Sequence, residues 1–96
     1  MRFASRHLEA LFERGAGARR YPVAVVRGFQ GLIHLLRAAP GLNDLYAIRS
    51  LHFEKLRGDR LGERSLRLND QYRLVVRIED PGDGPEVVVL EIVDYH

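Results

Sequence analysis

The sequence predicts an α+β fold in which two N-terminal helices pack on a twisted antiparallel sheet. Two observations carry this prediction. Apolar residues recur at helical spacing before Pro40, and the period then changes to the two-residue alternation of strands, which ends in a mostly apolar run over residues 86–93. The chain has 96 residues, and we expect one domain spanning residues 1–96.

The first predicted helix has a start signal and a stop signal. Residues 1–3 predict a short edge strand, and Ser5 then has the side chain of a helix N-cap. Gly15 follows the last apolar position and is a natural stop, because glycine readily adopts the left-handed conformation that ends a helix. The apolar positions between the two signals are Leu8, Leu11 and Phe12.

The second predicted helix follows a loop over residues 15–20. Tyr21-Pro22 starts it, since proline is tolerated in the first turn, and Pro40-Gly41 ends it. Gly28 and Gly31 each weaken it by up to about 1 kcal/mol relative to alanine, and we expect them to allow close packing against the first helix. Its apolar stripe consists of Val25, Phe29, Leu32 and Leu36.

The second half of the chain reads as strands and turns. Alternating apolar and polar residues indicate half-buried strands, and the run over 86–93 is typical of a central strand. The predicted elements are a loop over 42–50, a strand over 51–57, a strand around 65–69, an Asn69-Asp70-Gln71 turn, a strand over 72–79, a turn over 81–85 and a strand over 86–93.

The charge is small in total but uneven along the chain. The net charge is +2, and fourteen of the fifteen basic residues are arginine, whose planar fork suits phosphate. Residues 1–48 and 49–77 each carry +4, whereas residues 78–96 carry −6. A basic middle segment points to a polyanion partner, with a solvated strand face as the alternative. No cysteine, signal peptide or membrane-length apolar run is present, so we expect a cytoplasmic protein that makes no membrane contact.

Ionisable side chains gather where the last predicted strand ends. Asp94, Tyr95 and His96 follow the apolar run directly. A histidine titrates near neutral pH and can act as a general acid or base, although a solvated chain end is the alternative. The Asp94–His96 spacing is a weak signal for a metal ligand pair, and we predict neither a metal site nor a cofactor.

Two further positions suit phosphodiester chemistry. Arg73 lies on a predicted strand, where a fixed guanidinium can stabilise the charge that builds up on phosphorus. Glu54 lies between His52 and Lys55, where it is either a general base for a ribose hydroxyl or the partner of a neighbouring cation. Lys55 and Arg57 extend the basic region of Arg73. For each of these side chains the alternative is an ordinary exposed strand residue.

Three ordered segments resemble one family. Residues 53–62, 65–74 and 89–96 carry a leucine-arginine-glycine-aspartate segment, an asparagine-aspartate-glutamine-tyrosine-arginine turn and a final aspartate-tyrosine-histidine. Together they closely resemble the HigB family of RelE/ParE-superfamily toxins from bacterial toxin–antitoxin systems. The first half of the chain is similar to that family only in layout.

The resemblance implies a fold and an activity. Members have two helices on a twisted antiparallel sheet and cleave mRNA, usually in the ribosomal A site, without a metal. They are inhibited by a HigA-like helix-turn-helix antitoxin and meet DNA only through that complex. The expected partners are therefore the antitoxin, mRNA and the ribosome. The alternatives are a ParE-like topoisomerase inhibitor and a non-catalytic member that only binds its antitoxin as a co-repressor.

The resemblance also assigns roles to single residues. Asp94, Tyr95 and His96 match the catalytic C-terminal motif, and Arg73 matches the arginine that holds the scissile phosphate. Glu54 stands where some relatives have histidine, so either Glu54 takes the role of the base or His52 replaces it from a nearby position. The residues expected to contact RNA phosphates are Lys55, Arg57, Arg60 and Arg73.

Overall fold

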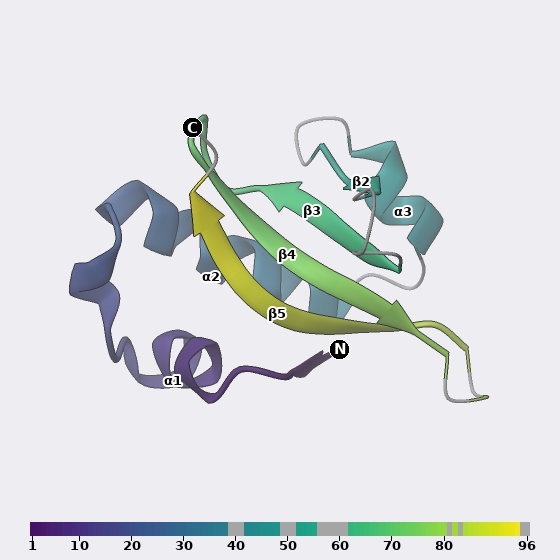
Figure 1. Cartoon of the computed structure of the whole chain (residues 1–96), viewed down its shortest axis with the longest axis horizontal. Coiled ribbons are helices and arrows are strands. Elements are labelled where there is room, and N and C mark those ends of the chain that lie inside the picture. The colour runs from purple at the N-terminus through teal and green to yellow at the C-terminus, as the bar shows by residue number, and fades with distance from the viewer. Residues whose placement is uncertain (39–41, 49–51, 56–61, 81, 83, 95–96) are drawn as a thin grey trace.

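The computed structural model describes residues 1–38, 42–48, 52–55, 62–80, 82 and 84–94. Helices and strands are segregated along the chain, as the change of period predicts (Figure 1). In chain order the elements are β1 (Arg2–Phe3), α1 (Arg6–Arg14), the short 3-10 helix η1 (Ala18–Arg20), α2 (Val23–Ala38), α3 (Leu42–Ala47), β2 (Glu54–Lys55), β3 (Glu63–Arg67), β4 (Tyr72–Glu79) and β5 (Glu86–Asp94).

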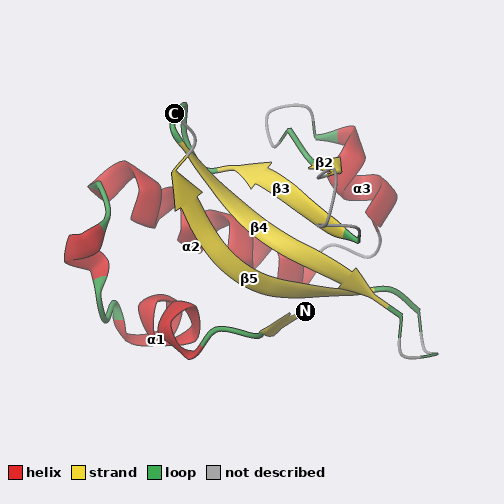
Figure 2. Ribbon diagram, in the orientation of Figure 1, coloured by secondary structure: helices red, strands yellow, loops and turns green. Residues whose placement is uncertain are grey.

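The strands form one twisted sheet in the order β1-β5-β4-β3-β2. The pairs from β5 to β2 are antiparallel, whereas β1 runs parallel to β5, with Arg2 opposite Val88. The α+β class, the edge strand at the N-terminus and the central place of the last strand are therefore confirmed. Helix α2 crosses behind the sheet, and the other face is turned toward the viewer in Figure 2.

Both ends of α1 are capped as the sequence predicts. The Ser5 hydroxyl accepts a hydrogen bond of 3.2 Å from the Leu8 backbone N–H, which satisfies one donor of the first turn. Gly15 ends the helix with φ of 68°, a left-handed conformation in which a side chain is strained. The exposed side of α1 carries charged residues and its buried side carries Leu8 and Leu11.

Helix α2 begins at Val23, directly after Pro22. The expectation that its glycines pack against α1 is wrong. A β-carbon built on Gly28 would lie 2.9 Å from the carbonyl oxygen of Leu68, so this glycine lets α2 approach the chain just after β3. A β-carbon on Gly31 would meet nothing within 4 Å. The predicted stop at Pro40-Gly41 lies outside the described residues.

Two predictions between α2 and β3 are corrected. The segment predicted as a loop over 42–50 contains α3, which Leu45 anchors in the core. The strand predicted over 51–57 begins only at Glu54 among the described residues. His52 has φ of 49°, a left-handed conformation that is incompatible with a strand, and it turns the chain so that Phe53 is buried.

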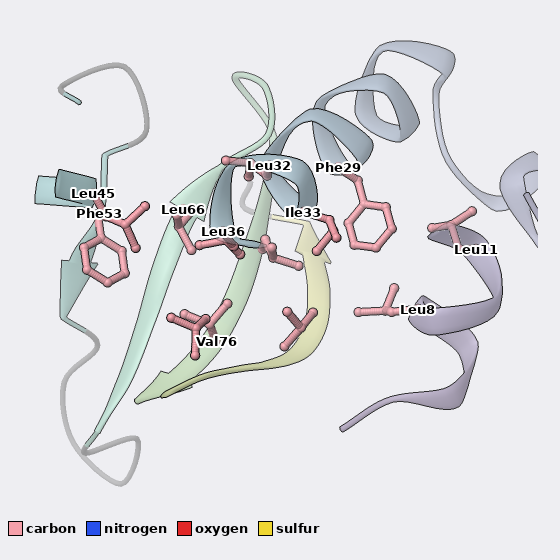
Figure 3. Packing of buried hydrophobic residues seen from close by; sticks show 13 residues of the cluster. Leu8, Leu11, Phe29, Leu32, Ile33, Leu36, Leu45, Phe53, Leu66 and Val76 are labelled. Carbon is pink, nitrogen blue, oxygen red and sulfur yellow. The ribbon is translucent and has the colours of Figure 1, made fainter. Parts of the chain in front are cut away.

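The core lies between the helices and one face of the sheet (Figure 3). The other face, called here the outer face, is not simply open, because Val75 and Val88 on it are fully buried. No helix in the part of the chain that the structure describes is long and apolar enough to cross a membrane. The core side chains are Leu8, Leu11, Phe29, Leu32, Ile33, Leu36, Leu45, Phe53, Leu66, Leu74, Val76, Val87 and Val89.

Candidate active site at the β3–β4 turn

Arg73 lies on the outer face of the sheet, next to the turn that joins β3 and β4. It is the second residue of β4 and stands opposite Arg67 of β3 and Val93 of β5. Its Nη1 donates a hydrogen bond of 2.8 Å to the carbonyl oxygen of Asn69 and a longer one of 3.5 Å to that of Tyr72. These bonds orient the half-buried guanidinium along the turn, so it is held in place before any anion arrives.

Asn69 organises this turn with its side chain. Its Oδ1 accepts hydrogen bonds from the backbone N–H of Gln71 (2.9 Å) and of Tyr72 (2.7 Å). This is the arrangement in which an Asn side chain replaces a backbone acceptor in a turn. The sequence predicts the turn, but it gives no sign that the Asn69 carbonyl also holds Arg73. The signal that the sequence offers for this contact is an asparagine at the start of a turn, four residues before an arginine in the next strand.

Asp94 is the last residue of β5 and stands opposite Tyr72. Its Oδ2 accepts a hydrogen bond of 3.1 Å from the Gln71 side chain. Val93 is the β5 residue paired with Arg73, so Asp94 and Arg73 lie on adjacent strands one residue apart in register. Alternation along the strands directs the Asp94 and Arg73 side chains to opposite faces at this end of the sheet. The structure therefore brings these two predicted site residues to one strand end.

Glu54 shares the outer face with Arg73 but is not its neighbour. It stands opposite Ser65 of β3, and Ser65 stands opposite Val75 of β4, two residues beyond Arg73. With strand spacings of about 4.8 Å and a rise of about 3.3 Å per residue, the two backbones are roughly 12 Å apart. Two long side chains can reach one nucleotide from such positions, but they do not form a direct pair there.

Lys55 does not extend the surface on which Arg73 lies. It stands opposite Arg64, whose β4 partner is Val76 of the core-facing row, so it belongs to the opposite face of the sheet. The two phosphate-binding positions proposed for this region are therefore separated by the sheet.

The left-handed conformation of His52 bears on its role as the alternative base. Strand alternation would place residues 52 and 54 on one face, but His52 precedes the strand with φ of 49°. Alternation therefore does not apply to it. The remaining predicted positions, Arg57, Arg60, Tyr95 and His96, lie outside the described residues.

An ionic cluster occupies the far end of the outer face. Glu79 accepts hydrogen bonds of 2.7 Å from both Arg77 and Arg2, and Arg2 also lies 3.8 Å from Glu86. The hydrogen bond from Arg77 and the contact with Arg2 hold the pKa of Glu79 below its ordinary value. Arginines at this end are thus matched by carboxylates.

Near the turn, two arginines stand side by side. Arg67 and Arg73 are directly opposite each other on β3 and β4, and Arg67 forms an ion pair with Asp70. Like charges at opposed positions repel unless an anion or a carboxylate lies close by. Two guanidinium groups at this end of the outer face are suited to contact an anionic ligand. Within the described ranges no three side chains of histidine, aspartate or glutamate gather as a metal would require.

Aromatic residues support the turn from the helical side. The Tyr21 ring lies edge-on to Tyr72, with centroids 6.4 Å apart, and its hydroxyl is 2.9 Å from His7 Nε2. Burial raises the pKa of Tyr21 above its ordinary value, and the neighbouring Arg20 partly opposes that rise. The contacts of Tyr21 thus link α1 and η1 to the first residue of β4, which directly precedes Arg73.

Comparison of the chain with models of protein families identifies its family. The family model described as a RelE-like toxin of the type II toxin–antitoxin system HigB matches residues 1–96. The chain belongs to this family. It is therefore a toxin of a type II toxin–antitoxin system, and an antitoxin is its partner. The family resemblance of the three sequence segments is confirmed.

A solved structure supports the fold of this toxin. The YoeB/ParE toxin from Agrobacterium tumefaciens is similar to it with a TM-score of 0.56 over 81% of each chain. The sequence identity is 23%, so this likeness concerns the arrangement of helices and strands alone. No curated protein sequence matches the toxin.

Proposed function

We propose that this toxin is a metal-independent endoribonuclease that cleaves mRNA on the ribosome and so inhibits translation. The observation that carries the proposal is the position of Arg73, which lies half-buried on the outer face beside a second arginine, with its guanidinium fixed by the Asn69 carbonyl. A guanidinium fixed in advance is suited to a phosphate that gains charge in the transition state. Membership of the RelE-like family supports the same proposal.

In this mechanism the 2′-hydroxyl of a ribose attacks the adjacent phosphorus. Glu54 or Asp94 accepts the proton of that hydroxyl, and His96 donates a proton to the departing 5′-oxygen. Arg73 stabilises the charge on the phosphorane-like centre, and Tyr95 contacts a base or a phosphate. One phosphorus–oxygen bond forms and one breaks, so the products are a 2′,3′-cyclic phosphate and a 5′-hydroxyl.

The two candidate bases differ in their position relative to Arg73 and in their hydrogen bonds. Glu54 is exposed and on the same face as Arg73, whereas Asp94 is closer in register but accepts a hydrogen bond from Gln71. Strand alternation also directs the Asp94 side chain to the face of the sheet opposite Arg73. Glu54 is therefore our first choice, and Glu54→Gln is expected to slow cleavage more than Asp94→Asn does.

We also propose the biological setting. The toxin acts in the cytoplasm as one domain over residues 1–96, contacts mRNA and ribosomal RNA, and is held inactive by a HigA-like helix-turn-helix antitoxin. It meets DNA only through that complex. Lys55, Arg57 and Arg60 contact RNA phosphates, and Arg57 also helps Arg73 to stabilise the charge at the scissile phosphate.

Induced expression followed by mapping of mRNA 5′ ends tests the proposal. Wild type is compared with His96→Gln and with His34→Gln, a change of an exposed histidine on α2. We expect in-frame cuts with wild type and His34→Gln, and a loss of about 100- to 10,000-fold with His96→Gln. Cuts that persist in His96→Gln remove that residue from the mechanism.

Purified components separate ribosome dependence from cleavage itself. Cutting of mRNA by the toxin, treated with EDTA and then freed of it, is expected with magnesium-containing ribosomes and not without ribosomes. A folded, antitoxin-free toxin that cuts no RNA and instead induces DNA damage contradicts the proposal and points to a topoisomerase target. A toxin that does neither and only strengthens operator binding by its antitoxin is a non-catalytic co-repressor.

A further inference from the structure

An exposed aromatic ring and two basic side chains lie together at the β2 edge of the sheet. We call Tyr46, Arg64 and Lys55 the Tyr46 patch. Tyr46 of α3 is 46% exposed, and among the described residues only Val23 is another large apolar or aromatic side chain so far exposed. An exposed tyrosine offers an aromatic face to a ligand while its hydroxyl can form a hydrogen bond.

The Tyr46 ring is held in place although it is not buried. It rests on Phe53, with centroids 4.7 Å apart and the planes inclined by 58°, and Phe53 itself is buried in the core. The Tyr46 hydroxyl accepts a hydrogen bond of 3.2 Å from Arg64 Nε. The preceding Leu45 anchors α3 beside Phe53 (Figure 3). The ring therefore offers a rigid surface to a ligand at little cost in conformational entropy.

The surroundings of the ring are basic. Lys55 stands directly opposite Arg64, so both side chains lie on one face of adjacent strands. The neighbouring carboxylates Glu54 and Glu63 alternate to the outer face. Asp44 lies two positions before Tyr46 on α3, and residues two apart do not face each other on a helix. The described parts of β2 and β3 thus place two cations and no carboxylate on this face.

We propose that the Tyr46 patch binds a nucleotide of single-stranded RNA, with a base stacked on Tyr46 and a phosphate held by Arg64 and Lys55. The proposal deepens the proposed function and rests on RNA being the ligand. Sites for single-stranded nucleic acid combine an aromatic ring for the base with cations for the backbone. Lys55 then has a role that its distance from Arg73 otherwise leaves unexplained.

The position of the patch sets the path of the RNA. Arg64 lies three residues along β3 from Arg67, which is directly opposite Arg73, and the Arg64 and Arg67 side chains alternate to opposite faces. An RNA strand that contacts both Arg73 and Tyr46 must therefore pass around the β2 edge of the sheet. The patch binds sequence flanking the scissile bond and takes no part in bond cleavage.

An RNA ligand fits the patch better than a protein does. Protein hot spots also use tyrosine and arginine, but they need surrounding apolar contacts that exclude water. Of the other exposed described residues of α3, Asn43 and Asp44 are polar and Ala47 offers only a methyl group. Binding of the antitoxin at this patch is instead one outcome of the test.

Fluorescence anisotropy with a short, labelled 2′-O-methyl RNA tests the proposal. This RNA cannot be cleaved, so the measurement stands even if the proposed nuclease activity fails. Tyr46→Leu keeps an apolar contact with Phe53 but has no aromatic face, and we expect binding to weaken about 5- to 150-fold. Tyr46→Phe keeps the ring and is expected to bind within about threefold of wild type.

Salt dependence tests the cations separately. Lys55→Gln is expected to reduce the slope of log affinity against log salt by about 0.7, the value for one phosphate contact on a single strand. Val23→Ala, a change of the other exposed apolar side chain, is the control and is expected to leave both affinity and slope unchanged. Denaturation curves of all variants show that each one folds.

Three outcomes overturn the proposal. The first is equal RNA binding by Tyr46→Leu and wild type. The second is equal weakening of RNA binding by Tyr46→Leu and Tyr46→Phe, which would assign the effect to the hydroxyl. The third is a folded Tyr46→Leu variant that still binds RNA but no longer binds the antitoxin. The last outcome makes the patch a protein interface. The mRNA 5′-end mapping with His96→Gln reports on cleavage independently of all three.

Discussion

The Arg73 guanidinium is fixed by the backbone of Asn69, four residues earlier, through a hydrogen bond of 2.8 Å. The same asparagine uses its side chain to hold the backbone N–H groups of Gln71 and Tyr72. One residue therefore sets both the shape of the β3–β4 turn and the direction of the arginine. Geometry at this position matters as much as charge.

The first prediction concerns Arg73→Lys, which keeps the charge but loses the planar fork and the bond to Asn69. We expect cleavage of mRNA to fall about 100- to 1,000-fold, the effect of removing one transition-state donor. Arg77→Lys changes an arginine on the same strand and face that pairs with Glu79, and it serves as the matched control. Equal activity of the two variants in single-turnover cleavage contradicts the role given to Arg73.

The second prediction concerns Asn69→Ala. The substitution leaves the backbone carbonyl but removes the acceptor for two backbone N–H groups, so we expect a loss of about 1–2 kcal/mol in the free energy of unfolding. Because Arg73 is then less well fixed, the cleavage rate should fall as well. Asn69→Asp restores an acceptor and should recover most of both losses. Urea titration and cleavage assays measure the two effects, and a full loss in Asn69→Asp argues against the turn as the cause.

The third prediction uses the two glycines of α2. Gly28→Ala places a β-carbon 2.9 Å from the Leu68 carbonyl oxygen, a backbone atom that cannot move cheaply, so we expect the free energy of unfolding to fall by about 1–3 kcal/mol. Gly31→Ala meets nothing within 4 Å and should gain up to about 1 kcal/mol from better helix propensity. Opposite signs in urea denaturation are expected. If both substitutions stabilise the toxin, the close approach at Leu68 is wrong.

The fourth prediction follows from the lowered pKa of Glu79. A carboxylate whose pKa is lowered in the folded state stabilises the fold above its unfolded pKa, and the stabilisation is lost as the pH falls through the folded pKa. The difference in Tm between wild type and Glu79→Gln should therefore be positive at neutral pH and shrink as the pH falls below about 4.5. Glu13→Gln, in an exposed carboxylate of α1, is the comparison. A difference that grows in acid has the wrong sign for this ion pair.

The fifth prediction concerns Tyr21, whose pKa is raised by burial. The difference between the ultraviolet pH titrations of wild type and Tyr21→Phe isolates this phenol, and its midpoint should lie above 10. The stabilisation from the neutral phenol is present below that pH and is lost as the pH rises through the raised pKa. Tyr21→Phe also removes the contact with His7 Nε2 and should cost about 1 kcal/mol at neutral pH. A midpoint at or below 10 rejects the burial of this group.

Local signals account for the parts of the fold that the sequence predicts well. The caps of α1 at Ser5 and Gly15 and the alternation in β4 depend on near neighbours, so one sequence is enough to locate them. Helix α3 was missed because a six-residue helix gives too short an apolar pattern, and its Leu45 is fixed by tertiary contact. The parallel pairing of β1 with β5 is likewise a property of the whole chain.

The sequence predicted which residues belong to the candidate site but not how they are arranged in space. Arg73 was placed on the outer face by alternation, and the register confirms that position. Lys55 was assigned to the same surface, but its register opposite Arg64 places it on the opposite face. The register between neighbouring strands thus decides which cations share a surface, and a single sequence does not specify that register.

The pairing of β1 with β5 also governs when the toxin can become active. Arg2 stands opposite Val88, so this contact joins residues 86 positions apart in the sequence, since 88 − 2 = 86. Strand β5 is the last element of the described chain to leave the ribosome, and it is the partner of both β1 and β4. A nascent chain without β5 has an incomplete sheet. It also lacks the strand end at which Asp94 lies beside the β3–β4 turn. The sheet, and with it the proposed RNA-cleavage site, is therefore completed only after nearly all of the described chain has been synthesised.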